Sequence, residues 1–476
     1  MINAPTNAAS AEVTPIDTQA RTPLLLLVGS GLVWLVVSGI FALITSIQLH
    51  SPHFLADCSI FTHGRAQAIR ETAFVYGWAA NAGLAIGLWI LGRLGGNLLR
   101  ALNWTVVGTL FWNLGVTAGL VGIAVGDMTS FSLLQLPRYV QPLLVVAYGA
   151  IALSGILAWG GRRNDSTYAS QWYAVAALFL FPWLLIAAQA VLLWMPVRGT
   201  AQAVAAGWYA QGAWALWLAP LALSAAYYII PKTSGRVLPS YDFAPLGFWT
   251  LLFLGSWTGG RNLIGGPVPA WIASLAVVAS SMVLFHYLVV FLNFRVATSA
   301  TGTGAKYIRF GLAAYLLWGL FEFLTSFRGV AIETQFTLIT PALDTLGLYG
   351  AISMIFYGAI TYMVPRVAGQ AWSSAALLAG HRMLVMVGIL LLVVALTAAG
   401  WSQEVALHDA KESLGAILTG MKTWLLVATV ANLILLGANF LLLVNFAKTA
   451  CSACCAKQSS TENLFRQPST LEASAT

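Results

Sequence analysis

Residues 207–220 read GWYAQGAWALWLAP, a run without any charged side chain. The run lies inside a longer apolar stretch at about 203–230, which exceeds the roughly 20 residues that an α-helix needs to cross a bilayer. An apolar stretch of this length predicts a membrane-spanning helix. Gln211 is then a polar side chain at membrane depth, where it needs a hydrogen-bond partner within the protein.

Similar apolar stretches recur along most of the 476 residues. Hydrophobic residues make up 59% of the chain and charged residues only 8%, whereas soluble domains carry nearer a quarter of charged residues. The sequence therefore predicts an all-α polytopic membrane protein and excludes an ordinary soluble globule. We expect twelve transmembrane helices, at about 23–49, 72–92, 102–126, 138–160, 171–195, 203–230, 245–260, 268–294, 308–327, 339–364, 379–401 and 417–446.

Polar tails flank the predicted membrane domain of residues 23–446. Residues 1–22 read as a cytoplasmic polar tail, and residues 447–476 read as a second cytoplasmic tail without regular structure. Most of the 23 lysine and arginine residues fall on the side of these tails, which is the cytoplasmic side by the positive-inside rule. The net charge of +8 therefore reflects topology and contact with anionic lipid, and we expect no nucleic-acid partner.

The cysteines and the glycine-rich segment predict no cofactor site. Cys58 stands alone, while the CSACC segment at 451–455 lies just inside the membrane and reads as reduced thiols. The segment GSWTGGRNLIGG at 255–266 has neither phosphate-loop nor dinucleotide-binding spacing. Its small residues are typical of closely packed membrane helices.

The run at 208–271 carries a family resemblance. Its spacing of tryptophan, tyrosine, proline, lysine and arginine resembles subunit I of the cbb-type cytochrome c oxidases, in the C family of heme-copper oxidases, where W-Y-G-H-N is followed by Y-Y-x-x-P-K and R-P-x-x-S-Y. The segments at 64–78, 343–366 and 380–389 are similar to further parts of that subunit. The matching positions in the first run are Trp208, Tyr209, Tyr227, Tyr228, Pro231, Lys232, Arg236, Ser240, Tyr241, Phe248, Trp249, Trp257 and Gly259.

The resemblance implies two b-type hemes, which this chain lacks the residues to ligate. The positions of the two low-spin heme histidines hold Arg70 and Thr345, and the position of the high-spin heme histidine holds Leu343. Arginine stays protonated, threonine is a poor donor and leucine has no donor atom. We therefore predict no heme bound at these positions.

The copper that the resemblance implies has lost its ligands as well. The three histidine positions hold Gln211, Arg261 and Asn262, and the position of the family's cross-linked tyrosine holds Gly255. A cation among the ligands would repel copper, which prefers imidazole or sulfur. We predict no metal and no intact catalytic residue, and we expect the three polar side chains to bond to each other, to water or to an acid. Two histidines, His286 and His381, read as hydrogen-bonded structural residues.

Three charges at or near membrane depth need a reason to persist: Glu322, Arg328 and Asp344. We expect an acid to neutralise an arginine in the vacated core, and specifically predict contact between Arg70 and Asp344, direct or through one water. A proton pathway through the acids is the alternative. Large side chains should refill the heme space, the candidates being Tyr76, Trp78, Leu343, Tyr349 and Phe356.

The resemblance and the substitutions together indicate a subunit I-like protein whose own heme and copper oxygen reduction is lost. We interpret it as a structural or assembly subunit of a respiratory electron-transport complex in the bacterial inner membrane, with membrane-anchored c-type cytochromes among its expected partners. Two alternatives stay open: an active cytochrome c oxidase subunit with unusual heme ligands, and a proton or ion carrier that uses Glu322 and Asp344.

Overall fold

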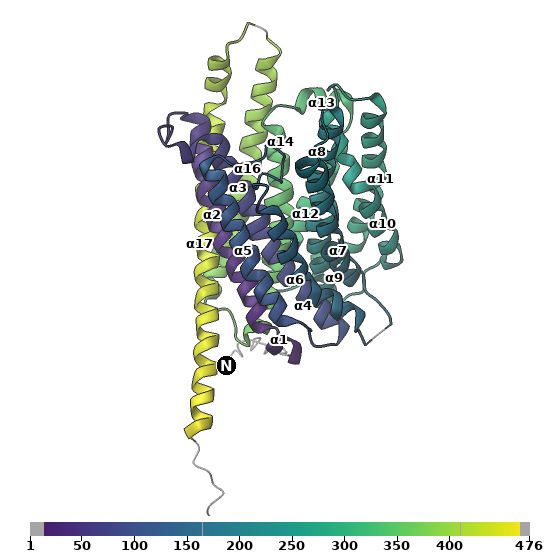
Figure 1. The fold of residues 1–476 in the computed structure, drawn as a ribbon, viewed down its shortest axis with the longest axis vertical. Helices are drawn as coiled ribbons and strands as arrows, with labels where there is room; N and C mark the ends of the chain where they lie inside the picture. The colour runs from purple at the N-terminus through teal and green to yellow at the C-terminus, as the bar shows by residue number, and fades with distance from the viewer. Residues whose placement is uncertain (1–13, 164, 410, 467–476) are drawn as a thin grey trace, which may run out of the picture.

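The fold is a bundle of long helices that run side by side (Figure 1). The computed structural model describes residues 14–466 with the exception of 164 and 410, and these described residues contain no strand. The predicted all-α fold class is confirmed. In the first half of the chain the α-helices are α1 (Pro15–Gln19), α2 (Arg21–His50), α3 (His63–Thr72), α4 (Ala80–Gly95), α5 (Leu102–Val125), α6 (Gln141–Gly160), α7 (Ala169–Gln189), α8 (Thr200–Gly212) and α9 (Ala219–Ser234).

The second half continues the bundle with helices of similar apolar character. These are α10 (Ala244–Leu254), α11 (Ala270–Phe294), α12 (Thr303–Leu324), α13 (Arg328–Thr334), α14 (Ile339–Thr345), α15 (Met354–Ala368), α16 (Ala375–Leu407) and α17 (Leu414–Arg466). Short 3₁₀ helices are η1 (Ser59–Phe61), η5 (Tyr241–Phe243), η6 (Gly255–Leu263) and η7 (Arg295–Ser299).

Four segments form the wider turns of a π-helix inside otherwise α-helical spans. They are η2 (Ala73–Ala79), η3 (Ala190–Trp194), η4 (Ala213–Leu218) and η8 (Leu346–Ser353). Three of them join two α-helices into one span, so that α3–α4, α8–α9 and α14–α15 each cross the bundle as a unit. Such π-segments are rare and frequently accompany functional sites.

Eleven helical spans of the described chain are long and apolar enough to cross a membrane, against the twelve that we expected. The difference lies at 245–260, where the α-helix α10 ends at Leu254 and the 3₁₀ helix η6 follows. Glycine permits this tight segment to pack closely, since a Cβ atom on Gly259 would lie 2.3 Å from the carbonyl oxygen of Gly207 in α8. The small residues of this segment thus serve close packing, as predicted.

Helices reach into both segments that the sequence predicts as polar tails. At the N-terminus α1 packs against the bundle, and the buried Asp17 accepts a hydrogen bond of 2.8 Å from the indole of Trp89 and pairs with Arg93 at 3.5 Å. At the other end α17 continues as a helix to Arg466 and extends beyond the bundle (Figure 1). Extending an existing helix avoids the cost of nucleating a new one, which the composition of the tail alone does not reveal.

Candidate functional site

Five of the six positions that hold metal-ligating histidines in the resembling family converge on one cavity. It has a volume of about 280 Å³ and is partly open to solvent. Its wall includes Arg70, Gln211, Arg261, Asn262 and Leu343. These five side chains come from four separate elements, α3, α8, η6 and α14.

The sixth position, Thr345, does not line this cavity. Its hydroxyl donates a hydrogen bond of 2.8 Å to the carbonyl oxygen of Pro341, one turn earlier in α14. Gly255, at the position of the family's cross-linked tyrosine, packs closely against a neighbouring helix. A Cβ atom there would lie 2.4 Å from the Cβ atom of Ala215, so a tyrosine does not fit this backbone.

The π-segments position three of these residues. Arg70 lies in α3 just before η2, Gln211 lies in α8 just before η4, and Leu343 lies in α14 just before η8. A π-turn inserts an extra residue and rotates the side chains that flank it relative to a continuous α-helix. The three helices that approach the cavity therefore share one backbone feature next to the residues that face it.

Glu322 lies between two of the former copper positions. Its carboxylate accepts a hydrogen bond from Nη2 of Arg261, with nitrogen–oxygen distances of 2.6 Å to Oε1 and 2.5 Å to Oε2, and Oε2 accepts a longer one of 3.3 Å from Nε2 of Gln211. The side chains of Arg261 and Glu322 are 11% and 10% exposed. The predicted neutralisation of an arginine by an acid is confirmed for this pair. Asn262 lines the cavity, but among the described residues its side chain has no hydrogen-bond partner.

Glu71 is a carboxylate on the cavity wall that the sequence analysis did not single out. Glu71 accepts hydrogen bonds from the amide nitrogens of Gln67, at 2.7 Å, and Gln135, at 2.5 Å. Both Gln67 and Glu71 line the cavity. The signal was available, because the adjacent Arg70 already marked this helix, but the contact with Gln135 joins residues 64 positions apart.

The predicted direct contact between Arg70 and Asp344 is wrong. Both residues line the cavity, yet the described part of the chain contains no ion pair between them. Asp344 is exposed to the cavity space, so water can hydrate its carboxylate without an arginine partner. A contact through one water stays a prediction. Arg328 is exposed at the first position of α13, so its assignment as a buried charge is also wrong.

Large side chains refill only part of the space that hemes occupy in the resembling family. Tyr76, Trp78 and Phe356 are at most 1% exposed, and Tyr349 packs on Phe74 with ring centroids 4.3 Å apart. Leu343, however, borders the cavity. Four of the five candidates thus pack inside the bundle, and Leu343 does not.

Two tryptophans close the space next to the cavity. Trp214 of η4 and Trp318 of α12 stack with ring centroids 4.9 Å apart. Gly347 of η8 makes this possible, since a Cβ atom there would lie 2.8 Å from Trp214 and 2.9 Å from the indole nitrogen of Trp318. The three helices thus meet through an aromatic contact where a larger residue at 347 would clash.

The two buried histidines are hydrogen-bonded within the bundle, as predicted. In His286, Nδ1 lies 2.9 Å from the carbonyl oxygen of Gly247 and Nε2 lies 3.0 Å from the hydroxyl of Tyr315. In His381, Nδ1 lies 2.6 Å from the hydroxyl of Tyr307. Neither histidine lines the cavity.

The donor set of the cavity does not fit heme iron or copper. The described residues of its wall include no histidine, cysteine or methionine. Guanidinium groups are cations without a lone pair to give, and amide oxygens suit hard cations better than copper or heme iron. The arrangement is instead a polar cavity, partly open to solvent, with five charged side chains, namely Arg70, Glu71, Arg261, Glu322 and Asp344.

Comparison with known proteins identifies a family and several relatives for this chain. The family model for "Cytochrome C and Quinol oxidase polypeptide I" matches residues 22–434. A "Cytochrome c oxidase subunit 1 homolog" of Agrobacterium tumefaciens (strain T37) is 25% identical over 396 residues, covering 78% of this chain and 71% of the relative. The "Cbb3-type cytochrome c oxidase subunit CcoN1" of Stutzerimonas stutzeri is 22% identical over 384 residues, covering 78% of this chain and 81% of the relative.

The fold agrees with the sequence comparison. A solved structure described as a heme-copper terminal oxidase dimer superposes on this chain with a TM-score of 0.69, at 11% sequence identity. The superposition covers 90% of this chain and 84% of the chain in that structure. At this identity the superposition shows the fold alone, whereas the family model spans most of the sequence. The chain is therefore a multi-pass membrane protein that belongs to the cytochrome c and quinol oxidase polypeptide I family.

Proposed function

We propose that this chain is a structural or assembly subunit of a respiratory electron-transport complex and that it has lost heme- and copper-based oxygen reduction of its own. The observation that carries the proposal is the ion pair of Arg261 with Glu322 at a former copper position. A guanidinium held there by a carboxylate adds a positive charge where a metal cation would bind, and so opposes metal binding.

The same residues supply a replacement for the cohesion that a metal provides. In the family a copper ion joins helices through its ligands. Here Glu322 of α12 bonds to Arg261 of η6 and to Gln211 of α8, so one carboxylate ties three elements together. This contact supports a role in which the scaffold is kept while the chemistry is lost.

The setting of the proposed subunit is the bacterial inner membrane, with both termini in the cytoplasm. The bias of lysine and arginine toward the loops on the side of the termini supports this orientation. Relatives named as cytochrome c oxidase subunits support a place among respiratory-complex subunits, with membrane-anchored c-type cytochromes as the partners we propose.

A carrier of protons or small cations is the second candidate, and one observation favours it. Glu322 and Asp344 both face the hydrated cavity, and Asp344 is free of any ion pair among the described residues. Carboxylates along a water-filled cavity are the usual elements of a proton relay. Against this, Glu322 is held in an ion pair with Arg261 and a hydrogen bond from Gln211, so it is not free to exchange partners along a relay.

An optical spectrum of the purified chain tests the proposal. We expect no Soret band that shifts on reduction, and no oxygen consumption by the chain alone, with a heme-binding relative purified in parallel as the positive control. A reducible Soret band near one heme per chain would contradict the loss of chemistry and favour the alternative of an active subunit with unusual ligands. Proton uptake into liposomes that depends on Asp344 would instead favour the carrier.

A further inference from the structure

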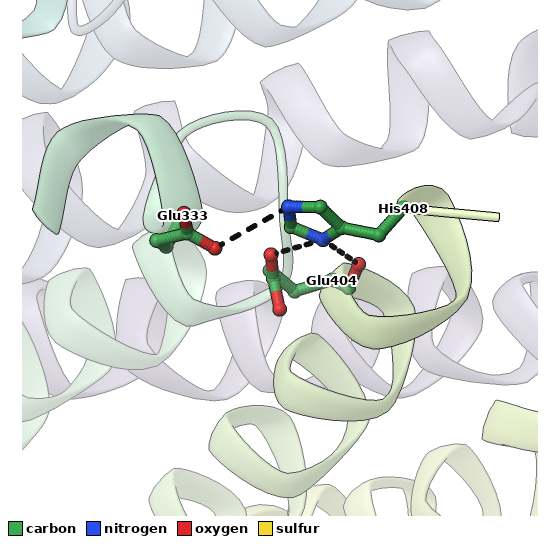
Figure 2. Close-up of side chains that lie close together, drawn as sticks. All are labelled: Glu333, Glu404 and His408. Carbon is green, nitrogen blue, oxygen red and sulfur yellow. Dashed lines mark hydrogen bonds and ion pairs between the residues drawn. The ribbon is translucent and has the colours of Figure 1, made fainter. Parts of the chain in front are cut away.

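Three side chains form a compact cluster at the end of α16, outside the cavity. Glu404 and His408 lie one helical turn apart, and Glu333 reaches them from α13 (Figure 2). One ligand atom from each residue can be chosen so that all three lie within 4.8 Å of one another. Ligand atoms about 2.1 Å from a first-row divalent cation stand roughly 3.3 Å apart, so a small rotation of these side chains brings the three atoms to that spacing.

The imidazole of His408 is oriented as a metal ligand requires. Its Nδ1 lies 3.2 Å from the backbone carbonyl oxygen of Glu404, so a proton on Nδ1 has an acceptor. A metal-binding histidine commonly donates its other ring N–H to a carbonyl in this way. The lone pair of Nε2 is then directed toward Oε2 of Glu333, at 3.7 Å (Figure 2). This separation is too long for a hydrogen bond but suits two ligands of one cation.

An independent observation comes from Glu404, which is only 7% exposed. Its buried Oε1 atom lies at ion-pair distance from His408, 2.7 Å from Nδ1, but accepts no hydrogen bond (Figure 2). A buried carboxylate oxygen without a hydrogen bond is costly, and a metal ion shared with Glu333 and His408 would stabilise it. Among the described residues neither Glu404 nor Glu333 pairs with a lysine or arginine.

We propose that Glu333, Glu404 and His408 bind a divalent first-row metal ion such as Zn²⁺, with water completing the coordination. One imidazole and two carboxylates form a donor set that suits Zn²⁺. The ion would join α13 to the end of α16. The three ligands lie outside the cavity, so this metal site does not depend on the proposed function.

The position of the metal site gives it a structural consequence for the cavity. Thr334 and Gln335 directly follow Glu333 and line the cavity wall. Nε2 of Gln335 donates a hydrogen bond of 3.1 Å to the carbonyl oxygen of Arg261. The same segment is tied to α16 by a hydrogen bond of 3.0 Å from the backbone of Leu338 to Gln403. A metal ion at Glu333 would therefore fix the segment that walls one side of the cavity.

Zinc titration of the purified full chain in detergent tests the proposal. The thiols are alkylated first, so that the CSACC segment contributes no zinc binding. We expect one Zn²⁺ per chain by calorimetry, and at least a tenfold weaker affinity in each of Glu333→Gln and His408→Gln, since loss of a ligand exceeds the effect of losing an outer-shell partner. The side chains of Glu333 and His408 are 46% and 63% exposed, so these variants should fold, which gel filtration checks.

The matched control is His53→Gln, which removes an exposed histidine outside the cluster. It should bind zinc as the unchanged chain does. Hydrogen exchange at 328–337 gives a second readout, and zinc should slow it in the unchanged chain but not in His408→Gln. Equal zinc affinity in the unchanged and His408→Gln chains would overturn the proposal, as would an equal loss in His53→Gln.

Discussion

Replacing Glu322 by glutamine tests whether the carboxylate holds the former copper site together. The change keeps the size of the side chain and removes the charge that faces Arg261 at 2.5 Å. Two unit charges about 4 Å apart attract by about 4 kcal/mol at an effective dielectric constant of 20. Removing one partner of a buried pair costs about 3 to 5 kcal/mol, because the other charge is left without compensation.

Two features of the site should keep the loss of unfolding free energy in Glu322→Gln below the upper end of that range. The amide oxygen of glutamine can still accept one hydrogen bond from Arg261, which retains about 1 kcal/mol. The cavity next to Arg261 also lets water approach the guanidinium. We therefore expect Glu322→Gln to lower the free energy of unfolding by about 2 to 3 kcal/mol, measured by equilibrium unfolding in mixed micelles.

The control is Glu412→Gln, an exposed glutamate near the start of α17. It should change the free energy of unfolding by less than about 0.5 kcal/mol. A double variant, Arg261→Met with Glu322→Met, removes both charges and should be less destabilised than the sum of its single variants. If Glu322→Gln behaves like Glu412→Gln, the carboxylate does not hold these helices together and the reasoning fails.

Three further substitutions probe other parts of the fold. Asp17→Ala should destabilise the chain by about 1 to 3 kcal/mol in the same assay, because the buried indole N–H of Trp89 loses its acceptor. Gly259→Ala should cost about 1 to 3 kcal/mol, since a Cβ atom there meets the carbonyl of Gly207, while Gly437→Ala, which has open space, should be neutral. Asp344→Asn should stay within about 0.5 kcal/mol of the unchanged chain, and a larger loss would indicate the ion pair that we do not find.

The sequence predicted most of the helices because each crossing of the bilayer requires a long apolar run. The predicted helix at 245–260 is α-helical only as far as Leu254, where α10 ends and a 3₁₀ segment follows. Hydropathy does not distinguish these two conformations, since both bury the same apolar residues. Close contact between Gly259 and Gly207, residues on different elements, decides which one forms.

The pairing of charges was the part that the sequence left open. Several acids were candidates for several arginines, and the family resemblance favoured Arg70 with Asp344. The bundle instead brings Glu322 of α12 to Arg261 of η6, 61 positions earlier in the chain. Ion pairing depends on a few ångströms of separation, and no sequence pattern sets a distance between helices this far apart.

By itself, the sequence determined that the chain is an all-helical membrane protein of an oxidase-like family with every expected metal-ligating position substituted. These properties follow from residue type and order, because an apolar run must leave water and arginine cannot replace histidine as a ligand. Only the tertiary structure decided that five of the six substituted positions line one polar cavity, and that Glu333 lies close to Glu404 and His408. Both depend on how separate helices pack, and packing sets which side chains share a space and which charges keep their water.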